Sequence, residues 1–390
     1  MTTETCDVLV VGAGPAGASL GASLAAAGRS VTVIESVRHP RPKACAEYAS
    51  PRIAEELERV GVPATAWQAD ARPVRGMRVI RGRDAVDVRY ADERGPRPAW
   101  GLDRTRFDAL LAQHAAASGA RLLDRTAFEQ ATRVGDGWLA TVRRSGRKLE
   151  IRSRWLIGAD GARSRVAHRL GVERAVQVPF RLGLVAHYEA DPELVDHGEM
   201  HVGSRHYVGL APLAGGRLNV GMALPAGDRR PAEERFEAAI ASMPAVAARL
   251  AGRQRLTPIR GASPIGHRVA HAAGPGWMLV GDAAGFIDPF TGEGIYRALR
   301  SARAAAGALG AGDDDAERRY LAERRAAFTA KDALTWTIQA LLAAPPVMGY
   351  ALRRLGARPG LALRLGSALG DCRPASDALS PMFLARVLRP

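Results

Sequence analysis

The chain has 390 residues, of which 47% are hydrophobic, and this length is enough for two or three packed regions. Its three cysteines are widely separated and provide neither a disulfide framework nor the spacing of a zinc site, which favours a reducing, cytoplasmic environment and no bound metal. The formal net charge of +15 comes almost entirely from arginine, but the basic residues do not form runs with interleaved aromatic side chains, which argues against nucleic-acid binding.

The sequence predicts neither a signal peptide nor a membrane-spanning segment. Glu4 and Asp7 stand where a signal peptide would carry basic residues. No uninterrupted apolar stretch approaches the roughly 18 residues that a spanning helix needs. Contact with a membrane could therefore occur only at its surface.

The first predicted elements are a strand, a glycine turn, a helix and a second strand. An apolar run over residues 6–11 leads into Gly-Ala-Gly-Pro-Ala-Gly at positions 12–17, which opens an Ala- and Leu-rich stretch that Gly28 ends. A second apolar run over 31–34 ends on Glu35. This order is typical of a βαβ unit that binds a dinucleotide, and the alternative is an α/β turn without a ligand.

Each residue of this motif has a physical role in dinucleotide binding. Gly12 allows the sharp turn, Gly14 lets a pyrophosphate approach the backbone, and Gly17 lets the helix pack closely on the strand. The helix N-terminus presents unpaired N–H groups to the phosphates. Glu35 can accept both ribose hydroxyls and would repel a 2′-phosphate, so we do not expect this crevice to hold NADP.

A proline-rich loop follows the second strand. Prolines disfavour a helix over 38–49, and the next helix is predicted over 52–60, with Ser50 as its cap and Pro51 in its first turn. The loop carries Lys43, Cys45, Glu47 and Tyr48 just beyond the nucleotide-binding strand. These side chains are therefore either part of the site or members of an ordinary surface loop.

The middle and the end of the chain alternate between sheet and helix. The patterns predict strands over 74–88, a helix over 103–117 capped by Asp103, a β-meander over 121–149, an antiparallel sheet over 180–224, one helix over 231–250, and helices from 316 interrupted at 345–346.

Two further strands run into glycine-bearing turns. The first leads into Gly-Ala-Asp-Gly-Ala-Arg-Ser at 158–164, and the second into Gly-Asp-Ala-Ala-Gly-Phe-Ile-Asp-Pro-Phe-Thr-Gly-Glu-Gly-Ile at 281–295. Together with the turn at 12–17, they resemble the three FAD-binding signatures of flavoproteins with the fold of p-hydroxybenzoate hydroxylase. Within that superfamily the third signature, the loop Lys43-x-Cys45-x-Glu47 and Arg104 are similar to the geranylgeranyl reductase branch.

The resemblance implies an α/β fold in three parts. The parts are a Rossmann-like FAD-binding domain from residues 1–75, 100–175 and 265–320, an antiparallel-sheet substrate domain from 76–99 and 176–264, and a C-terminal helical region over 321–390. It also implies tightly bound FAD, with NAD(P)H as a transient electron donor.

The same resemblance assigns the cofactor contacts. Asp282 would accept hydrogen bonds from ribityl hydroxyls, and the turn at 289–294 would bring backbone N–H groups toward the flavin edge that becomes negative on reduction. Asp160 would lie near FAD and the nicotinamide approach, unless it only caps a helix. The residues expected to bind FAD are Gly12, Gly14, Ala16, Gly17, Glu35, Ser36, Lys43, Ala44, Arg104, Asp160, Gly161, Asp282, Pro289, Gly292, Glu293, Gly294 and Ile295.

FAD binding leaves the reaction open. The first interpretation is reduction or dehydrogenation of a hydrophobic polyprenyl, polyketide or aromatic molecule in bacterial secondary metabolism, with Cys45, Glu47 or Tyr48 as catalytic proton donor. The alternative is monooxygenation through a flavin hydroperoxide, which needs few catalytic side chains. Ala46, in place of the glycine usual in the reductases, puts the role of Cys45 in question. A lesser alternative is a flavin-binding protein without catalytic activity.

Two other regions could contribute to substrate handling. The predicted substrate domain carries the polar candidates Arg181, His187, His201 and Tyr207, although a lone strand histidine is more often structural. The C-terminal region combines apolar side chains with arginines. We expect it to cap the substrate cavity, and the alternative is attachment to a membrane surface.

Overall fold

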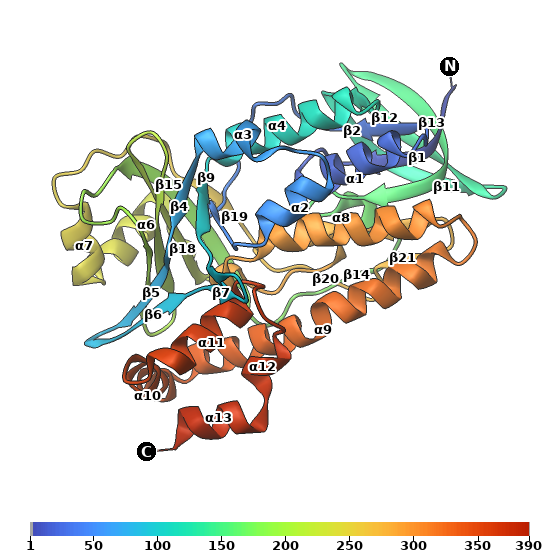
Figure 1. Ribbon diagram of the computed structural model, residues 1–390. Helices are drawn as coiled ribbons and strands as arrows, with labels where there is room; N and C mark the ends of the chain where they lie inside the picture. Colours follow the sequence, from blue (N-terminus) through green and yellow to red (C-terminus); the bar gives the residue numbers. More distant parts are fainter. Residues whose placement is uncertain (1–2, 390) are drawn as a thin grey trace.

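A largely parallel sheet forms the first layer of the computed structural model, which describes residues 3–389 (Figure 1). Its strand order is β10-β2-β1-β13-β12-β11, and β22 lies against the carboxyl end of β13. The strands are β1 (Thr3–Val11), β2 (Val31–Ile34), β10 (Arg121–Leu123), β11 (Thr126–Val134), β12 (Gly137–Arg144), β13 (Arg147–Gly158), β21 (Ala273–Gly274) and β22 (Trp277–Leu279). The antiparallel run β11–β12–β13 confirms the predicted meander.

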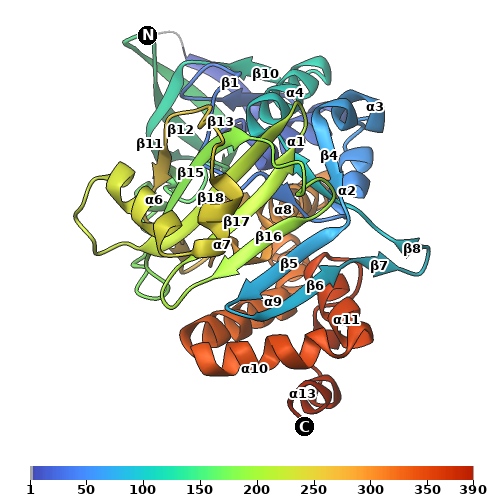
Figure 2. The same cartoon turned by 90° about the vertical axis from the view of Figure 1, so that its left-hand side faces the viewer.

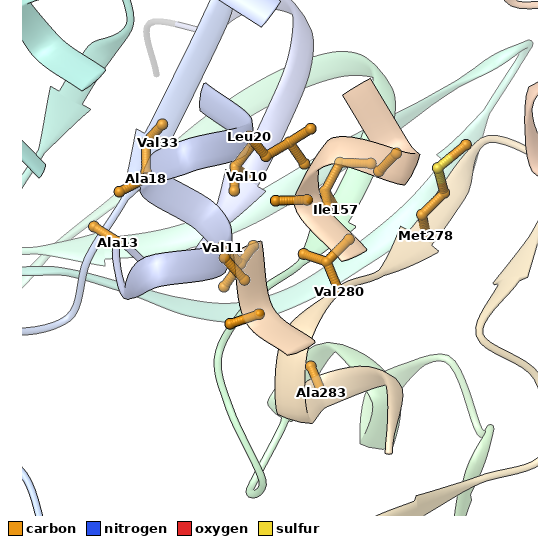
Figure 3. Close-up of a cluster of buried hydrophobic side chains, with 14 of the residues drawn as sticks. Val10, Val11, Ala13, Ala18, Leu20, Val33, Ile157, Met278, Val280 and Ala283 are labelled. Atoms are coloured by element: carbon orange, nitrogen blue, oxygen red, sulfur yellow. The ribbon is translucent and has the colours of Figure 1, made fainter. Parts of the chain in front are cut away.

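The register of three parallel strands brings the three glycine turns to one edge of this sheet. Val11 at the end of β1 lies opposite Gly158 at the end of β13, which lies opposite Leu279 of β22. Figure 3 shows the buried side chains around these ends, including Ile157 and Met278. The carboxyl ends of the three parallel strands therefore bring segments far apart in the sequence to one edge of the sheet, which is where sheets of this kind bind ligands.

Three helices pack side by side along this sheet (Figure 1). They are α1 (Pro15–Ala26), α4 (Arg104–Ala117) and α8 (Gly294–Gly310). The Asp103 carboxylate accepts hydrogen bonds from the N–H groups of Thr105 and Arg106 and so caps α4, as predicted. A Cβ added at Gly17 would lie 1.9 Å from the carbonyl oxygen of Gly12, so only glycine allows α1 to start this close to β1.

A seven-stranded sheet forms the second layer, with the order β19-β15-β18-β17-β16-β5-β6 (Figure 2). All neighbours are antiparallel except β16 and β5. The strands are β5 (Gly76–Arg81), β6 (Asp84–Arg89), β15 (Arg181–Glu189), β16 (Gly198–Val202), β17 (Tyr207–Leu213), β18 (Arg217–Pro225) and β19 (Arg260–Ala262). This sheet therefore combines strands from two separate parts of the chain, residues 76–89 and 181–262, with first-layer segments between them in the sequence.

Two predicted helix features are wrong. The single helix over 231–250 is two helices, α6 (Ala232–Ala241) and α7 (Pro244–Leu250), because Pro244 cannot continue a helix and starts the second one. Ser50 does not cap the next helix, α2 (Ile53–Arg59), whose preceding residue Arg52 has helical backbone angles and makes no side-chain cap.

Short elements connect the two layers. They are α3 (Ala64–Trp67), α5 (Arg165–Arg169), β3 (Tyr48–Ala49), β4 (Ala71–Val74), β7 (Ala91–Asp92), β8 (Gly95–Pro96), β9 (Ala99–Leu102), β14 (Glu173–Arg174) and β20 (Arg268–Val269). Strands β3, β9 and β4 form a small sheet that fixes the end of the proline-rich loop.

Five helices form the described C-terminal region; the first runs along α8, and two others, over residues 345–356 and 359–369, pack on the β5–β6 strands (Figures 1 and 2). The five helices are α9 (Ala316–Ala343), α10 (Pro345–Gly356), α11 (Pro359–Leu369), α12 (Ser376–Leu379) and α13 (Pro381–Leu388). No helix in the described part of the chain is long and apolar enough to cross a membrane. Residues 1–2 and 390, the ends of the predicted terminal segments, lie outside it. The predicted domain boundaries and membrane contact stay predictions.

A buried ion cluster attaches these helices to the third glycine turn. Lys331 Nζ on α9 lies 2.8 Å from Glu293 Oε2 and 2.9 Å from Asp371 Oδ1. Burial opposes the charge on Lys331, but the two carboxylates raise its pKa overall. Burial also raises the pKa of Asp371, to about 6, against the attraction of Lys331. One cation therefore neutralises carboxylates from two distant parts of the chain.

We expect Lys331→Met to destabilise the protein by about 3–5 kcal/mol, because it removes the cation that pairs with buried Asp371 and leaves Glu293 with Arg297, 3.5 Å away, as its remaining cation. Urea unfolding measures this loss. Lys148→Met, at an exposed lysine of β13, is the control and should cost less than about 0.5 kcal/mol. Equal stabilities of the two variants would contradict the role of the cluster.

Candidate functional site

The end of β2 holds the predicted ribose-binding carboxylate in a fixed position. Glu35 is buried, its Oε2 accepts hydrogen bonds from Ala13 N at 3.1 Å and Arg41 Nη2 at 3.2 Å, and its Oε1 accepts one from Ser36 Oγ. Burial would raise the pKa of Glu35, but Arg41 and the Ala13 N–H hold it below the usual value. The carboxylate is therefore ionised at neutral pH and able to accept hydrogen bonds from hydroxyl groups.

The first glycine turn leaves space where a pyrophosphate would lie. A Cβ added at Gly12 would lie 2.5 Å from the carbonyl oxygen of Ala159, so the protein itself excludes a side chain there. A Cβ added at Gly14 would meet no other part of the protein within 4 Å. Ala16, buried in α1, faces Gly281 of the third signature. Packing within the protein therefore does not require glycine at position 14, and the open space is available to a ligand.

The second signature is mainly structural in its side chains. Asp160 accepts hydrogen bonds from Ser164 Oγ at 2.6 Å and from the N–H groups of Arg165 and Val166, so it caps α5, which was the alternative interpretation. Burial raises the pKa of this carboxyl. Gly161 has φ +80°, and a Cβ there would lie 3.9 Å from Lys43 Nζ. The exposed Lys43 therefore extends over this turn and has no ion pair with any described residue.

The third signature offers a free carboxylate and a helix start. Asp282 follows β22 and is half-buried, and its carboxylate makes no hydrogen bond or ion pair with residues 3–389, although its backbone oxygen accepts from the Gly285 N–H. Pro289 begins a short 3-10 turn, Gly292 has φ +69°, and Gly294 is the first residue of α8. The Glu293 side chain points instead into the Lys331 cluster, so only its backbone remains for a ligand.

The loop with Cys45 lies between the two sheets. Arg104 Nη1 donates to Cys45 Sγ at 3.2 Å, and the Glu47 N–H donates to the same sulfur at 3.4 Å. Two hydrogen bonds of 2.7 and 2.8 Å fix the Arg104 guanidinium on Asp108. Burial alone would lower the pKa of Arg104, but Asp108 and Cys45 raise it. The sulfur therefore lies beside a permanent positive charge.

Glu47 is buried and fully engaged. Its Oε1 accepts from Arg104 N at 2.9 Å, and its Oε2 accepts from His187 Nε2 at 2.6 Å and Asn219 Nδ2 at 2.9 Å. Asn219 Nδ2 also donates to the Cys45 carbonyl oxygen, so β18 is hydrogen-bonded to the loop at both Cys45 and Glu47.

Tyr48 is a poor candidate for proton transfer. Its hydroxyl is buried and shares a 2.7 Å hydrogen bond with the hydroxyl of Tyr90. Burial raises the pKa of Tyr48 well above its usual value. Its ring lies against Gly292, since a Cβ there would approach the ring to 2.8 Å. Tyr48 therefore joins the loop to the third signature, and the structure argues against a catalytic role.

A basic cavity of about 580 Å³ opens beside the second signature. Its cationic side chains are Arg163, Arg165 and Arg174, and Phe180 lies exposed at its edge. His267 is buried in its wall, where burial lowers its pKa and Nε2 has no hydrogen-bond partner within the described residues. The cavity favours an anionic, partly aromatic ligand.

Comparison with known proteins agrees with this geometry. Residues 5–332 match the model of the FAD binding domain family. The chain belongs to this family. It is 31% identical to menaquinone reductase of Mycolicibacterium smegmatis over 312 residues, 77% of this chain and 75% of that protein.

A further relative places the flavoprotein in the geranylgeranyl reductase branch, and a solved structure shares its fold. Digeranylgeranylglycerophospholipid reductase 1 of Methanothermobacter thermautotrophicus is 31% identical over 82% of this chain and 81% of that protein. A geranylgeranyl bacteriochlorophyll reductase-like protein from Thermoplasma acidophilum shares the fold, with a TM-score of 0.80, 22% identity, and coverage of 99% of this chain and 97% of that one. The flavoprotein is an FAD-dependent oxidoreductase, as the sequence signatures indicated.

Sequence reasoning did not find the partners of the loop. Asn219 and Asp108 were not predicted as site residues, and His187 was not linked to Glu47. The available signals were strand alternation, which puts His187 and Asn219 opposite each other on β15 and β18, and the i,i+4 spacing of Arg104 and Asp108 on one helix face.

We expect Gly14→Ala to fold normally but to bind FAD at least about tenfold more weakly, because its Cβ would occupy the space left for the pyrophosphate. Flavin absorbance per protein after gel filtration measures this loss. Gly307→Ala in α8 also meets no neighbour and is the control, expected to keep FAD and to gain about 0.5–1 kcal/mol in stability. Full FAD content in Gly14→Ala would contradict the placement of the pyrophosphate.

Proposed function

We propose that the flavoprotein uses FAD to reduce a hydrophobic prenyl compound. The relatives that cover most of the chain are named as reductases of menaquinone and of digeranylgeranylglycerophospholipid, two compounds with long apolar isoprenoid chains. Bound FAD would supply a hydride. The protein would then have to hold the apolar substrate, exclude water, and supply one proton to the product.

The observation that carries this proposal is the polar cluster around Cys45 and Glu47. Sulfur, guanidinium, carboxylate and imidazole groups meet at the contact between the loop and the second sheet. A reduction needs a proton donor at this place, whereas oxygen transfer from a flavin hydroperoxide needs chiefly a dry pocket. Monooxygenation therefore remains the second candidate.

The sheet face next to the loop also suits an apolar chain. Gly209 and Gly221 lie opposite each other on β17 and β18, and Met200 lies opposite Gly209 on the next strand. A Cβ at Gly221 would lie 3.5 Å from the Cα of Ala46. Small residues at these positions keep the loop close to the sheet and add no polar groups that a prenyl chain would leave unpaired.

Anaerobic reoxidation tests the proposal directly. We expect reduced protein, freed of excess dithionite, to be reoxidised without oxygen by a menaquinone with a four-isoprene side chain. After air reoxidation of the quinone ring, the product should be heavier by two hydrogens, because reduction of the ring alone would also restore the flavin absorbance but would leave the side chain unchanged. Return of the oxidised spectrum only after oxygen is added, through a transient near-ultraviolet adduct, would instead establish monooxygenation.

The Cys45→Ala variant sharpens this test. Loss of the sulfur removes the Arg104 and Glu47 contacts at the loop, so we expect substrate-driven reoxidation to slow by at least about tenfold with FAD content unchanged. Cys6→Ala, on β1 and far from the loop in the fold, is the control. Unchanged reoxidation in Cys45→Ala would exclude a catalytic role for this residue.

We also propose that the basic cavity receives NAD(P)H as electron donor. Arg163 lines the cavity and makes no hydrogen bond or ion pair with any residue between 3 and 389, so it is available for a phosphate. We expect Arg163→Ala to raise the NAD(P)H concentration needed for half-maximal flavin reduction by about tenfold without affecting reduction by dithionite. Arg83→Ala, at the exposed β5–β6 turn, is the control, and equal behaviour of both variants would contradict the assignment.

A further inference from the structure

His187 and Glu47 form a carboxylate–histidine pair at the contact between the loop and the second sheet. The Oε2 atom of Glu47 lies 2.6 Å from Nε2 of His187. Asn219 Nδ2 donates to the same oxygen at 2.9 Å, and Arg104 N donates to the other oxygen. The carboxylate therefore has fixed partners on both oxygens and cannot turn away from the histidine.

The second ring nitrogen of His187 remains available. No described residue forms a hydrogen bond with Nδ1, and the side chain is 16% exposed although its carboxylate partner is buried. A carboxylate on one nitrogen fixes the ring orientation and the tautomer, and it stabilises the imidazolium. The other nitrogen can then carry an exchangeable proton toward the space in front of the loop.

The backbone at Glu47 shows that this pairing is enforced. Glu47 has φ +54°, a left-handed conformation that a non-glycine residue adopts at a cost of about 1–3 kcal/mol. The adjacent Ala46 packs over Gly221, and Asn219 holds the Cys45 carbonyl oxygen. The fold thus keeps a strained residue in place and directs its carboxylate to His187, as is common at functional sites.

A second carboxylate–histidine pair on the same sheet lacks these features. His201 Nε2 lies 2.8 Å from Glu199 Oε2 on β16, and both side chains are buried. Arg249 of α7 bonds to both oxygens of Glu199, so the pair faces the α6–α7 side of the sheet. It is a structural ion cluster and provides an internal comparison for His187.

We propose that His187, oriented by Glu47 and Asn219, delivers the proton of the reduction; this assignment rests on the proposed function. The charged group in contact with His187 is Glu47; Arg104 bonds to Glu47 through its backbone N–H and to the Cys45 sulfur through its guanidinium. Bound reduced FAD would supply a hydride to one carbon of the substrate double bond and would itself be oxidised. The π electron pair would form a C–H bond at the other carbon with the proton on His187 Nδ1, and the neutral imidazole left behind would regain a proton from water.

Two variants at position 187 separate proton transfer from structure. His187→Gln keeps a donor for the Glu47 carboxylate but cannot carry a proton, and His187→Ala leaves a space that imidazole can enter. In the anaerobic reoxidation with the four-isoprene menaquinone, we expect both variants to slow the reaction by about 100-fold or more, with dithionite reduction and FAD content unchanged. Added imidazole should restore a large part of the rate in His187→Ala only. His201→Gln should react at the wild-type rate.

The outcomes distinguish this assignment from the proposed function. Wild-type protein that is not reoxidised by the prenyl quinone would overturn both. Wild-type reoxidation with an unchanged rate in His187→Gln would overturn the role of His187 alone. A slow His187→Ala variant that imidazole does not restore would also overturn it, because the residue would then act only through the structure.

Discussion

The parallel pairing of β1, β13 and β22 is the constraint on which the site depends. Each strand ends in a glycine turn, and the register places Val11, Gly158 and Leu279 side by side. The register of the sheet alone therefore brings the three distant glycine turns together. The buried apolar cluster around Ile157 and Met278 stabilises this pairing (Figure 3).

The second requirement is that the Cys45 loop be held from two sides. Tyr48 packs on Gly292 of the third signature, while Asn219 of the second sheet holds Cys45 and Glu47. The Arg104 guanidinium has its own carboxylate in Asp108, so it lies beside the sulfur without an uncompensated buried charge. The two sheets thus meet at one short segment that contains Cys45, Glu47 and Tyr48.

Local sequence determined the first layer well, because strand, glycine turn and helix follow one another within about 30 residues. Gly14 could be assigned to ligand binding because the sequence around it already predicted a glycine turn between a strand and a helix. The partners of Glu47 could not be predicted, since His187 and Asn219 are more than a hundred residues away and meet it only through sheet pairing. Likewise, the side chain of Glu293, in the third glycine turn, pairs with Lys331, and no local sequence pattern indicates this ion pair. The break at Pro244 was visible in the sequence, since a proline cannot continue a helix.

We propose that FAD and the substrate meet at the Cys45–Tyr48 loop, in front of His187. A crystal structure of the FAD-loaded protein with the four-isoprene menaquinone tests it most directly. We expect that structure to show the flavin ring between this loop and the turn at Pro289–Gly294. A substrate carbon should lie about 3–3.5 Å from His187 Nδ1. A flavin ring on the side of the Arg163 cavity, with His187 out of contact with the substrate, would contradict it.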